Sequence, residues 1–497
     1  MKTNQKNLFV FISINNILIY LLIIASILTA CVDKSHLENN NNENNSNGNS
    51  NNPTEQTPLY VYPFSQEIKS IESQITITTK PNTSLDDITL SIPPLKYNKS
   101  FLFFLIQDDC VQSAFCRTWA SINQKPLTDK YYYDIRHIFA QDLPPDYYTL
   151  DKTLGIDDGT GNEVRFHFTT TVFPEDGPKS TEMFNSPTEV NPGFTENYFR
   201  FYLKNYCIWD NVIEMVNYGN SIAFHDVVGP LTQSSIYEHL LICQDSIKQN
   251  LSQRGAKVLA EPNGNMDYYY AGLNVEDIKI MTGQGNATGV IYPFSETTEL
   301  NKAFIKRDFI NPDQTKIKIN SELSKPKEER KAVLVGVHGT NNTWSDFLLW
   351  LNDNYGKDGD NSLWMPSLEE YYEYNYYRQN ANITKNVIND TTIQINISIP
   401  MENNFYYPSF TLNIEGINMD NLSNISSNDN VKGLSYNNYD GNLMINIDCR
   451  KFLYEHALHY VEQYENQKTQ SNKRDAQYFI SFLKPSPEKD QLLDRVK

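Results

Sequence analysis

The sequence predicts an α/β fold organised around a distorted parallel (β/α) barrel with small β-rich flanking regions. The first observation is the run Phe101–Ile106, six apolar residues without period-2 alternation, which is typical of a strand buried on both faces of a parallel sheet. The second is the alternation of strand and helix patterns across residues 99–380, which fits a barrel or a doubly wound sheet. The third is a set of carboxylates and histidines at strand ends, which together with the length of 497 residues favours the barrel.

The N-terminal residues are predicted to carry an export signal and an anchor. Two lysines precede a long apolar run that ends at Leu28, and Leu28-Thr-Ala-Cys31 is similar to a bacterial lipobox. We therefore expect a lipoprotein signal peptide over 1–31 and lipid attachment at Cys31. A transmembrane anchor is the alternative, because the run is long enough to span a bilayer. Since Val32 is not the aspartate that retains lipoproteins at the inner membrane, we expect a surface or outer-membrane location.

Composition limits the classes of partner. Residues 32–58 are rich in Asn, Glu, Ser and Gly and predict a disordered Asn-rich tether. The whole chain has 42 basic and 60 acidic side chains and a net charge of −18, so nucleic acid is a poor partner. Apart from Cys31 the cysteines are odd in number and lack CxxC spacing, which argues against a disulfide framework or a structural zinc site.

The globular part is predicted to have four regions. Residues 59–98 contain short alternating segments and read as an N-terminal β element. Residues 99–380 form the barrel, with strands expected at Asn220–Phe224, Ala256–Leu259 and Lys331–Val337. Residues 381–466 alternate apolar and polar positions between turn residues and then become helical, which predicts a β-sandwich and a helix. Residues 467–497 are charged and are expected at the periphery.

The candidate functional residues follow predicted barrel strands. Asp108 and Asp109 end the first buried strand, and His225 and His338 end two later ones. In parallel barrels the carboxyl ends of the strands carry the chemistry, and adjacent carboxylates there are costly to desolvate. The alternative for the acidic pair is that one residue caps the next helix while the other is solvated.

These residues also resemble those of a known family. Lys96-Tyr-Asn-Lys-Ser-Phe, the apolar strand and Asp108-Asp109 are similar to the opening of bacterial polysaccharide deacetylases, the NodB-homology domain of carbohydrate esterase family 4. Downstream, Gly219–His225 and Val335–His338 resemble two further motifs of that family, and Ala260-Glu-Pro-Asn-Gly264 stands where its Arg-x-Pro-x-Gly motif falls.

The resemblance implies a role for each residue. Asp108 would be the catalytic base and His338 the general acid. Asp109 and His225 would bind a divalent metal, which we expect to be zinc. The metal would polarise an acetyl carbonyl and activate water, the aspartate would accept the proton of that water, and the histidine would protonate the departing sugar amine.

Three positions depart from the family pattern. Cys110 replaces the glycine after the aspartates, Gly229 replaces the second metal histidine, and Ala260 replaces the arginine that orients the catalytic aspartate. Loss of one of three protein ligands weakens a zinc site. Asp226 or His239 could substitute for the missing ligand.

Two functions remain open at this point. The first is metal-dependent hydrolysis of acetyl groups on a cell-surface or extracellular polysaccharide by a lipid-anchored enzyme. The second is a catalytically degenerate relative that acts as a glycan-binding or scaffold lipoprotein. The retained Asp108, Asp109, His225 and His338 favour the first, and the missing histidine and arginine favour the second.

Overall fold

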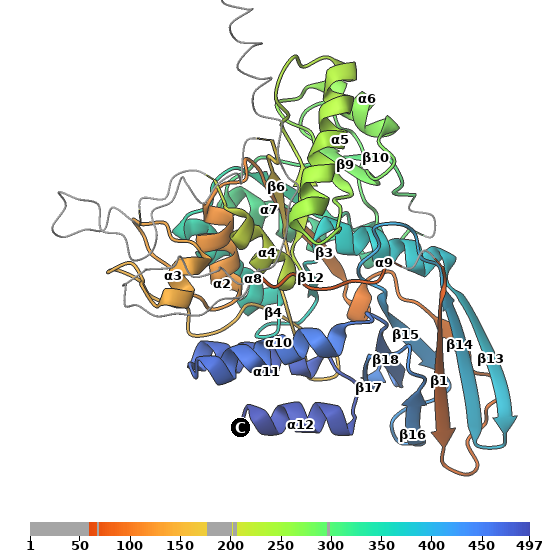
Figure 1. The fold of residues 1–497 in the computed structure, drawn as a ribbon. Coiled ribbons are helices and arrows are strands. Elements are labelled where there is room, and N and C mark those ends of the chain that lie inside the picture. The colour runs from red at the N-terminus through yellow and green to blue at the C-terminus, as the bar shows by residue number, and fades with distance from the viewer. Residues whose placement is uncertain (1–58, 67–68, 176–200, 202–205, 296–298) are drawn as a thin grey trace, which may run out of the picture. The chain divides into compact units, whose positions relative to one another are not determined.

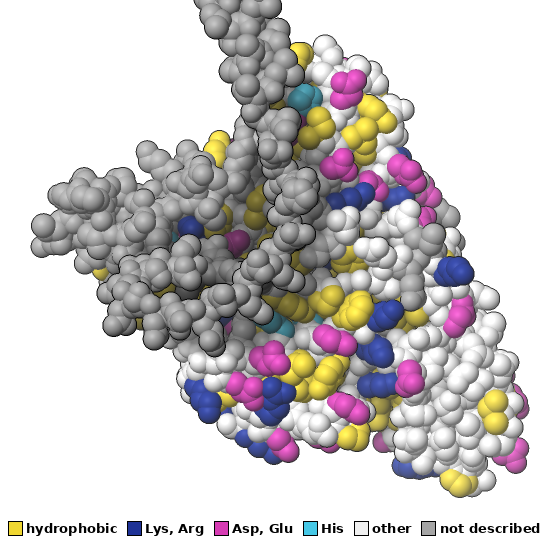
Figure 2. Space-filling view, viewed as in Figure 1, with side chains coloured by type: hydrophobic (Ala, Val, Ile, Leu, Met, Phe, Trp, Pro, Cys, Tyr) yellow, Lys and Arg dark blue, Asp and Glu magenta, His cyan; other side chains and the backbone are white. Residues whose placement is uncertain are grey.

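The computed structural model describes residues 59–66, 69–175, 201, 206–295 and 299–497; the remaining residues are grey in Figure 1 and in Figure 2. The stretch from Leu59 to Lys497 is a single structural unit. The predicted signal peptide, Cys31 and the tether fall on residues 1–58 and so lie outside the described residues. Among the helices of the described ranges, none has the length and apolar character needed to cross a bilayer.

A parallel sheet that curls into a barrel carries the central region (Figure 1), so the fold class is confirmed. The strand predicted at Phe101–Ile106 is its longest, and every one of its residues is buried. The short β12 (Leu363–Trp364) extends the sheet beside the start of that strand. In sheet order the barrel strands are β10 (Ala303–Lys306), β9 (Ile280–Gly283), β8 (Val258–Ala260), β7 (Ser221–Phe224), β6 (Thr169–Val172), β3 (Phe101–Gln107) and β11 (Val333–Val337).

A backbone bridge joins the two outer strands of this sheet. Asp308, two residues beyond β10, forms a parallel bridge with Val335 of β11. Its N–H donates to the carbonyl of Leu334 at 3.0 Å, and its own carbonyl accepts from Gly336 at 3.0 Å. The sheet is therefore nearly closed, and the carboxyl ends of all its strands meet at one mouth.

Helices follow most barrel strands and cover them with apolar faces. In α5 the residues Ile236, Leu240, Cys243 and Ile247 share one face and are buried. Gly272 lets α6 approach the sheet closely, because a Cβ there would lie 2.7 Å from the sulfur of Met281. The helices of this region are η1 (Lys96–Asn98), η2 (Ala114–Trp119), α2 (Ala120–Ile122), α3 (Ile135–Ala140), α4 (Trp209–Asn217), α5 (Gln233–Asn250), α6 (Met266–Asn274), α7 (Pro312–Leu323), η5 (Lys327–Glu329), α8 (Asn342–Tyr355) and α9 (Leu368–Asn380).

The β-rich regions at the two ends of the globular part combine into one pair of antiparallel sheets. One has the order β13 (Asn382–Asn389), β14 (Thr392–Ile399), β1 (Ile71–Thr79) and β16 (Leu422–Ser427). The other has the order β17 (Gly433–Tyr439), β18 (Asn442–Asp448), β15 (Ser409–Glu415) and β2 (Thr89–Ser91). A separate hairpin pairs β4 (Gly155–Asp157) with β5 (Glu163–Arg165). The two strands from residues 59–98, β1 and β2, therefore each join a sheet whose other strands come from the C-terminal region.

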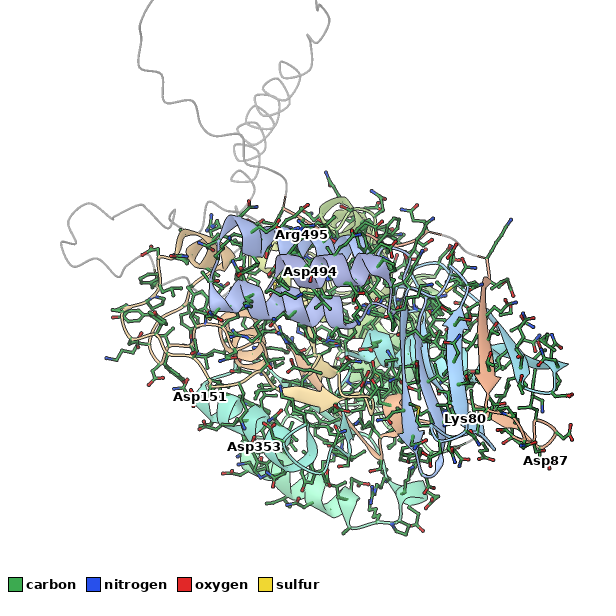
Figure 3. All side chains as sticks on the ribbon, turned by 90° about the horizontal axis from the view of Figure 1, so that it is seen from below. Lys80, Asp87, Asp151, Asp353, Asp494 and Arg495 are labelled. Carbon is green, nitrogen blue, oxygen red and sulfur yellow. The ribbon has the colours of Figure 1, made fainter. Side chains whose placement is uncertain are left out.

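Three helices end the chain: α10 (Leu453–Asn466), α11 (Gln470–Ser481) and α12 (Pro487–Arg495). Figure 3 labels Arg495 on α12, which pairs with Glu465 of α10 at 2.7 Å. Residues 467–497, expected at the periphery, bury Tyr478, Phe479 and Ile480 of α11. Ala476, Phe479 and Ile480 have the i, i+3, i+4 spacing of one apolar helix face, and Tyr478 is buried beside that face.

Candidate active site

Four charged or ionisable side chains from three barrel strands lie at the mouth. Asp108 and Asp109 follow β3, His225 follows β7, and His338 follows β11. The Nε2 atom of His225 lies 3.4 Å from Oδ1 of Asp109 and 3.9 Å from Oδ2 of Asp108. The Nε2 atom of His338 lies 4.0 Å from Oδ2 of Asp109. The structure thus brings together all four residues that the sequence singled out.

Asp108 is the buried member of the acidic pair, with 1% of its surface exposed. Its backbone N–H donates to the carbonyl of Val337 at 2.8 Å, which fixes the end of β3 against β11. Its Oδ1 accepts a hydrogen bond from the guanidinium of Arg307. Its Oδ2 is buried and accepts no hydrogen bond from the described residues. One oxygen is therefore held while the other faces His225, as a proton acceptor requires.

Asp109 is turned toward solvent by an unusual backbone. Asp109 and Cys110 have φ values of 63° and 46°, in the left-handed region that favours glycine. This conformation explains why the family pattern has glycine after the acidic pair. Contact with His225 lowers the pKa of Asp109, with smaller help from the charges of His338 and Arg307, although partial burial opposes the shift.

His225 has a defined orientation. Its Nδ1 lies 2.6 Å from the carbonyl oxygen of Ala260, which can only accept, so Nδ1 carries the proton. Its ring stacks on Phe173 with centroids 5.6 Å apart. Burial lowers the pKa of His225, but the charge of Asp108 and the contact with Asp109 outweigh it, and the pKa stands above its ordinary value. In the neutral form its Nε2 lone pair faces the two aspartates.

The spacing of Asp109 and His225 suits two ligands of one metal ion. Two tetrahedral zinc ligands with bonds of about 2.0–2.1 Å lie about 3.3 Å apart, and Nε2 of His225 is 3.4 Å from Oδ1 of Asp109. The hydrogen bond from Nδ1 of His225 to a carbonyl is also typical of metal-bound histidine. These two residues fit the group, and they supply two of the three protein ligands that a catalytic zinc site uses.

Among the described residues, no third donor joins Asp109 and His225. Gly229 has φ +100°, and a Cβ there would lie 3.2 Å from Nε2 of His239. His239 bonds through Nδ1 to Glu175, and Asp226 accepts from Tyr268 at 3.3 Å. Within the described ranges, no group of three His, Cys, Asp or Glu side chains is placed to hold a metal ion. Neither proposed substitute therefore joins Asp109 and His225 in a three-ligand cluster.

Arg307, which sequence reasoning missed, occupies the centre of the site. It follows β10 directly, its side chain has no solvent exposure, and it pairs with Asp108. Its Nη2 donates to the carbonyl of Glu261 at 2.6 Å. The sequence signal was weak, because a basic residue after a four-residue strand is usually solvated. Arg307 thus supplies from β10 the guanidinium that the family motif would have placed at Ala260.

His338 is the exposed member of the site. Its side chain is 59% exposed. Its ring lies 5.0 Å from that of Phe309, which also packs against Gly336. An imidazole at the rim can exchange protons with solvent and reach a bound substrate, which suits a proton donor better than a buried structural group.

A parallel barrel with a held aspartate, two histidines and a buried arginine at its mouth belongs to the class of barrel proteins whose chemistry takes place at the carboxyl ends of the strands. A family model described as "putative polysaccharide deacetylase" matches residues 73–497. The chain belongs to this polysaccharide deacetylase family. The match includes the barrel, nearly all of the two antiparallel sheets and the C-terminal helices. No curated protein matches the chain.

Proposed function

We propose that this protein removes acetyl groups from an N-acetylated or O-acetylated polysaccharide at the barrel mouth, with a divalent metal, by preference zinc, held by Asp109 and His225. The observation that carries the proposal is the state of Asp108. Its Oδ1 is held by buried Arg307, and its buried Oδ2 accepts no hydrogen bond from the described residues. A buried carboxylate oxygen without a hydrogen-bond partner destabilises the fold unless a ligand or a water molecule donates a hydrogen bond to it.

The residues divide the chemistry among them. When bound, the metal would polarise the acetyl carbonyl and make water more acidic. Oδ2 of Asp108 takes the proton of the attacking water, while Arg307 orients that carboxylate. His338, exposed at the rim, donates a proton to the departing amine or alcohol of the sugar. Acetate and a free amino or hydroxyl group are the products.

A second candidate is a degenerate relative that binds glycan without cleaving it. Gly229 favours it, because the third metal ligand of the family is absent at that position and a side chain there would be strained. This alternative predicts polysaccharide binding without acetate release.

The test is acetate release by the purified full chain from acetylated chitooligosaccharides and acetylated xylan, with added zinc and after chelation. We expect zinc-dependent release that Asp108→Asn lowers by about a hundredfold or more, since a general base contributes at least that much. Asp346→Asn is the matched control, because Asp346 is exposed on α8. Binding of the polymer without any release in zinc would instead support the degenerate relative.

We also propose that the protein is held at the cell surface or outer membrane by lipid on Cys31. The lipobox-like Leu28-Thr-Ala-Cys31 and the polar segment after it support this. Cys31→Ser should move the protein from the membrane fraction to the soluble fraction and remove the lipid mass. Retention of the variant in membranes with an intact N-terminus would favour a transmembrane anchor.

A further inference from the structure

A cavity of about 280 Å³ lies at the opposite end of the barrel from the proposed active site. Arg254 on its wall precedes β8, so it stands at the amino end of the barrel strands. The other walls are the segment before β1 and the loops that lead into β15, β17 and α10. We call it the basal cavity.

The basal cavity combines aromatic and cationic walls. Tyr62, Phe64, Phe405, Tyr406 and Tyr407 line it. Among the described residues, one carboxylate lines it, that of Asp429, together with four basic side chains: Arg254, Lys432, Arg450 and Lys451. In a chain of net charge −18 this local excess of positive charge is a specific feature.

Both arginines of the cavity are held rigidly. Arg254 donates to Glu369 at 3.0 Å and to the hydroxyl of Tyr407 at 2.7 Å. Arg450 forms a forked pair with Asp448, with an Nη2–Oδ2 distance of 2.6 Å. Neither carboxylate lines the cavity. The guanidinium groups are thus oriented by carboxylates behind the wall, and the field they present to the cavity is fixed before any ligand binds.

Two polar groups of the wall have no partner in the part of the chain that the structure describes. Tyr62 is 8% exposed, and its hydroxyl makes no hydrogen bond. Burial raises the pKa of Tyr62 to about 12, although the charges of Arg450 and Arg254 oppose the shift. The guanidinium of Arg450 lies 5.8 Å from the centre of the Tyr62 ring. The ammonium of Lys432 forms no ion pair within the described ranges. A neutral donor and a cation are therefore available together.

We propose that the basal cavity binds a sugar ring that carries an anionic group. The aromatic side chains give the cavity apolar walls, although His456 stacks on Tyr62 and Arg254 lies over Tyr406. The hydroxyl of Tyr62 offers a hydrogen bond, and Lys432 pairs with the anion. Ligand pockets usually begin at about 300 Å³, so a cavity of about 280 Å³ admits one or two sugar units. The anion can belong to a uronic acid residue of a polysaccharide or to a free sugar phosphate.

The test is calorimetric titration of the full chain with glucuronate, glucuronate disaccharides and glucose 6-phosphate. Glucose and inorganic phosphate serve as ring-only and anion-only probes. We expect binding of the anionic sugars and none of the two partial probes. Whichever binds more tightly, the glucuronate compounds or glucose 6-phosphate, identifies the anionic group that the cavity recognises.

Substitutions of residues that line the basal cavity test whether it binds a ligand or is only a packing void. Tyr62→Phe should weaken binding about tenfold, in line with one lost hydrogen bond. Tyr460→Phe is its control, because the hydroxyl of Tyr460 is also buried without a partner among the described residues but lies outside the cavity. Lys432→Gln should weaken binding by a similar factor, and Lys468→Gln, exposed on the chain after α10, should not.

The mouth and the basal cavity can be tested apart. Asp108→Asn should bind the anionic sugars as the wild type does, since the two sites lie at opposite ends of the barrel. The proposal is overturned if no anionic sugar binds, if inorganic phosphate binds as tightly as glucose 6-phosphate, or if Tyr460→Phe loses as much affinity as Tyr62→Phe.

Discussion

At the scale of single residues, the pairing with Arg307 fixes the position of the Asp108 carboxylate at the mouth. Both side chains have lost nearly all contact with water, and their side-chain exposures are 0% and 1%. Such a pair is maintained only when further hydrogen bonds satisfy the buried charges. The carbonyl of Glu261 provides one of these for the guanidinium. Arg307 is therefore a positioning residue, since it acts on the reaction through Asp108.

Arg307→Ala should be strongly destabilising and inactive, because it leaves the carboxylate of Asp108 buried and unpaired. Removal of one partner of a buried pair typically costs about 3–5 kcal/mol. Urea unfolding measures this loss, and acetate release measures the activity. Arg307→Lys keeps the charge but not the fork that reaches Asp108 and Glu261 together, so it should retain more stability and part of the rate.

The control for Arg307 is Arg495→Ala. Arg495 is labelled in Figure 3 and forms an exposed pair with Glu465. Exposed pairs contribute little to stability, because water screens the two charges. Equal unfolding midpoints for Arg307→Ala and Arg495→Ala would show that Asp108 does not depend on the guanidinium.

The sequence could predict the mouth residues that follow long apolar runs. Asp108 and His338 end such runs, and parallel strands necessarily bring their ends together. Arg307 could not be found this way, because β10 is short and half exposed, with the burial pattern of an edge segment. The replacement at Ala260 signalled a missing guanidinium, but only the barrel geometry shows which strand supplies it.

At the scale of elements, α9 connects the barrel to the sheets through buried acids. Glu369 pairs with Arg254 at 3.0 Å, and Glu373 pairs with Lys257 at 2.6 Å. Glu370 bonds to Nδ1 of His167 at 2.9 Å. A helix that reads as charged and aromatic in the sequence is therefore buried over most of its length. Sequence patterns cannot predict this, because the partners of each carboxylate come from distant segments.

Glu370→Gln should destabilise the protein at neutral pH and flatten its acid response. The pKa of Glu370 falls to about 2; burial opposes the shift, but the bonds with His167 and Lys96 outweigh it. A carboxyl with a depressed folded pKa stabilises the fold above its unfolded value of about 4.3, and this stability is lost as pH falls toward 2. This lowering of the pKa of Glu370 corresponds to about 3 kcal/mol of unfolding free energy at neutral pH.

Unfolding midpoints between pH 2 and pH 7 measure the effect of Glu370→Gln. The wild type should lose stability more steeply than the variant below pH 4. Glu328→Gln, exposed in η5, is the control and should follow the wild type. Parallel pH profiles for wild type and Glu370→Gln would contradict the assignment of this stability to Glu370.

Boundaries of the barrel strands were predicted to within a few residues. The strand expected at Lys331–Val337 is β11, Val333–Val337, and the one expected at Asn220–Phe224 is β7, Ser221–Phe224. Long apolar runs bounded by polar residues leave little freedom in register. The bridge through Asp308 that nearly closes the barrel was not predictable, because a single pair of backbone hydrogen bonds leaves no hydrophobic pattern.

At the scale of the molecule, the two ends of the globular part are joined by strand pairing. The alternation in 71–79 predicted a strand, but a period-2 pattern does not specify its partner. The structure pairs β1 with β14 on one side and β16 on the other, as Figure 1 shows with β1 beside β14. Residues separated by more than 300 positions thus share one sheet, and the same hydrophobic core continues into the barrel.

This pairing predicts that Ile77→Ala destabilises the whole unit in one transition. Ile77 is fully buried and lies opposite Ile393 on one side and Ile425 on the other. Truncation of a buried isoleucine costs about 2–5 kcal/mol, and because the sheets and the barrel share one core, both should unfold together. Val387→Ala is the control: Val387 is 52% exposed on β13 and should change stability by about 0.5 kcal/mol or less. Calorimetry of Ile77→Ala should show one unfolding peak at a lower temperature than in the wild type. A second peak at the wild-type temperature would mean that the barrel folds independently of the strands that the N-terminal region contributes.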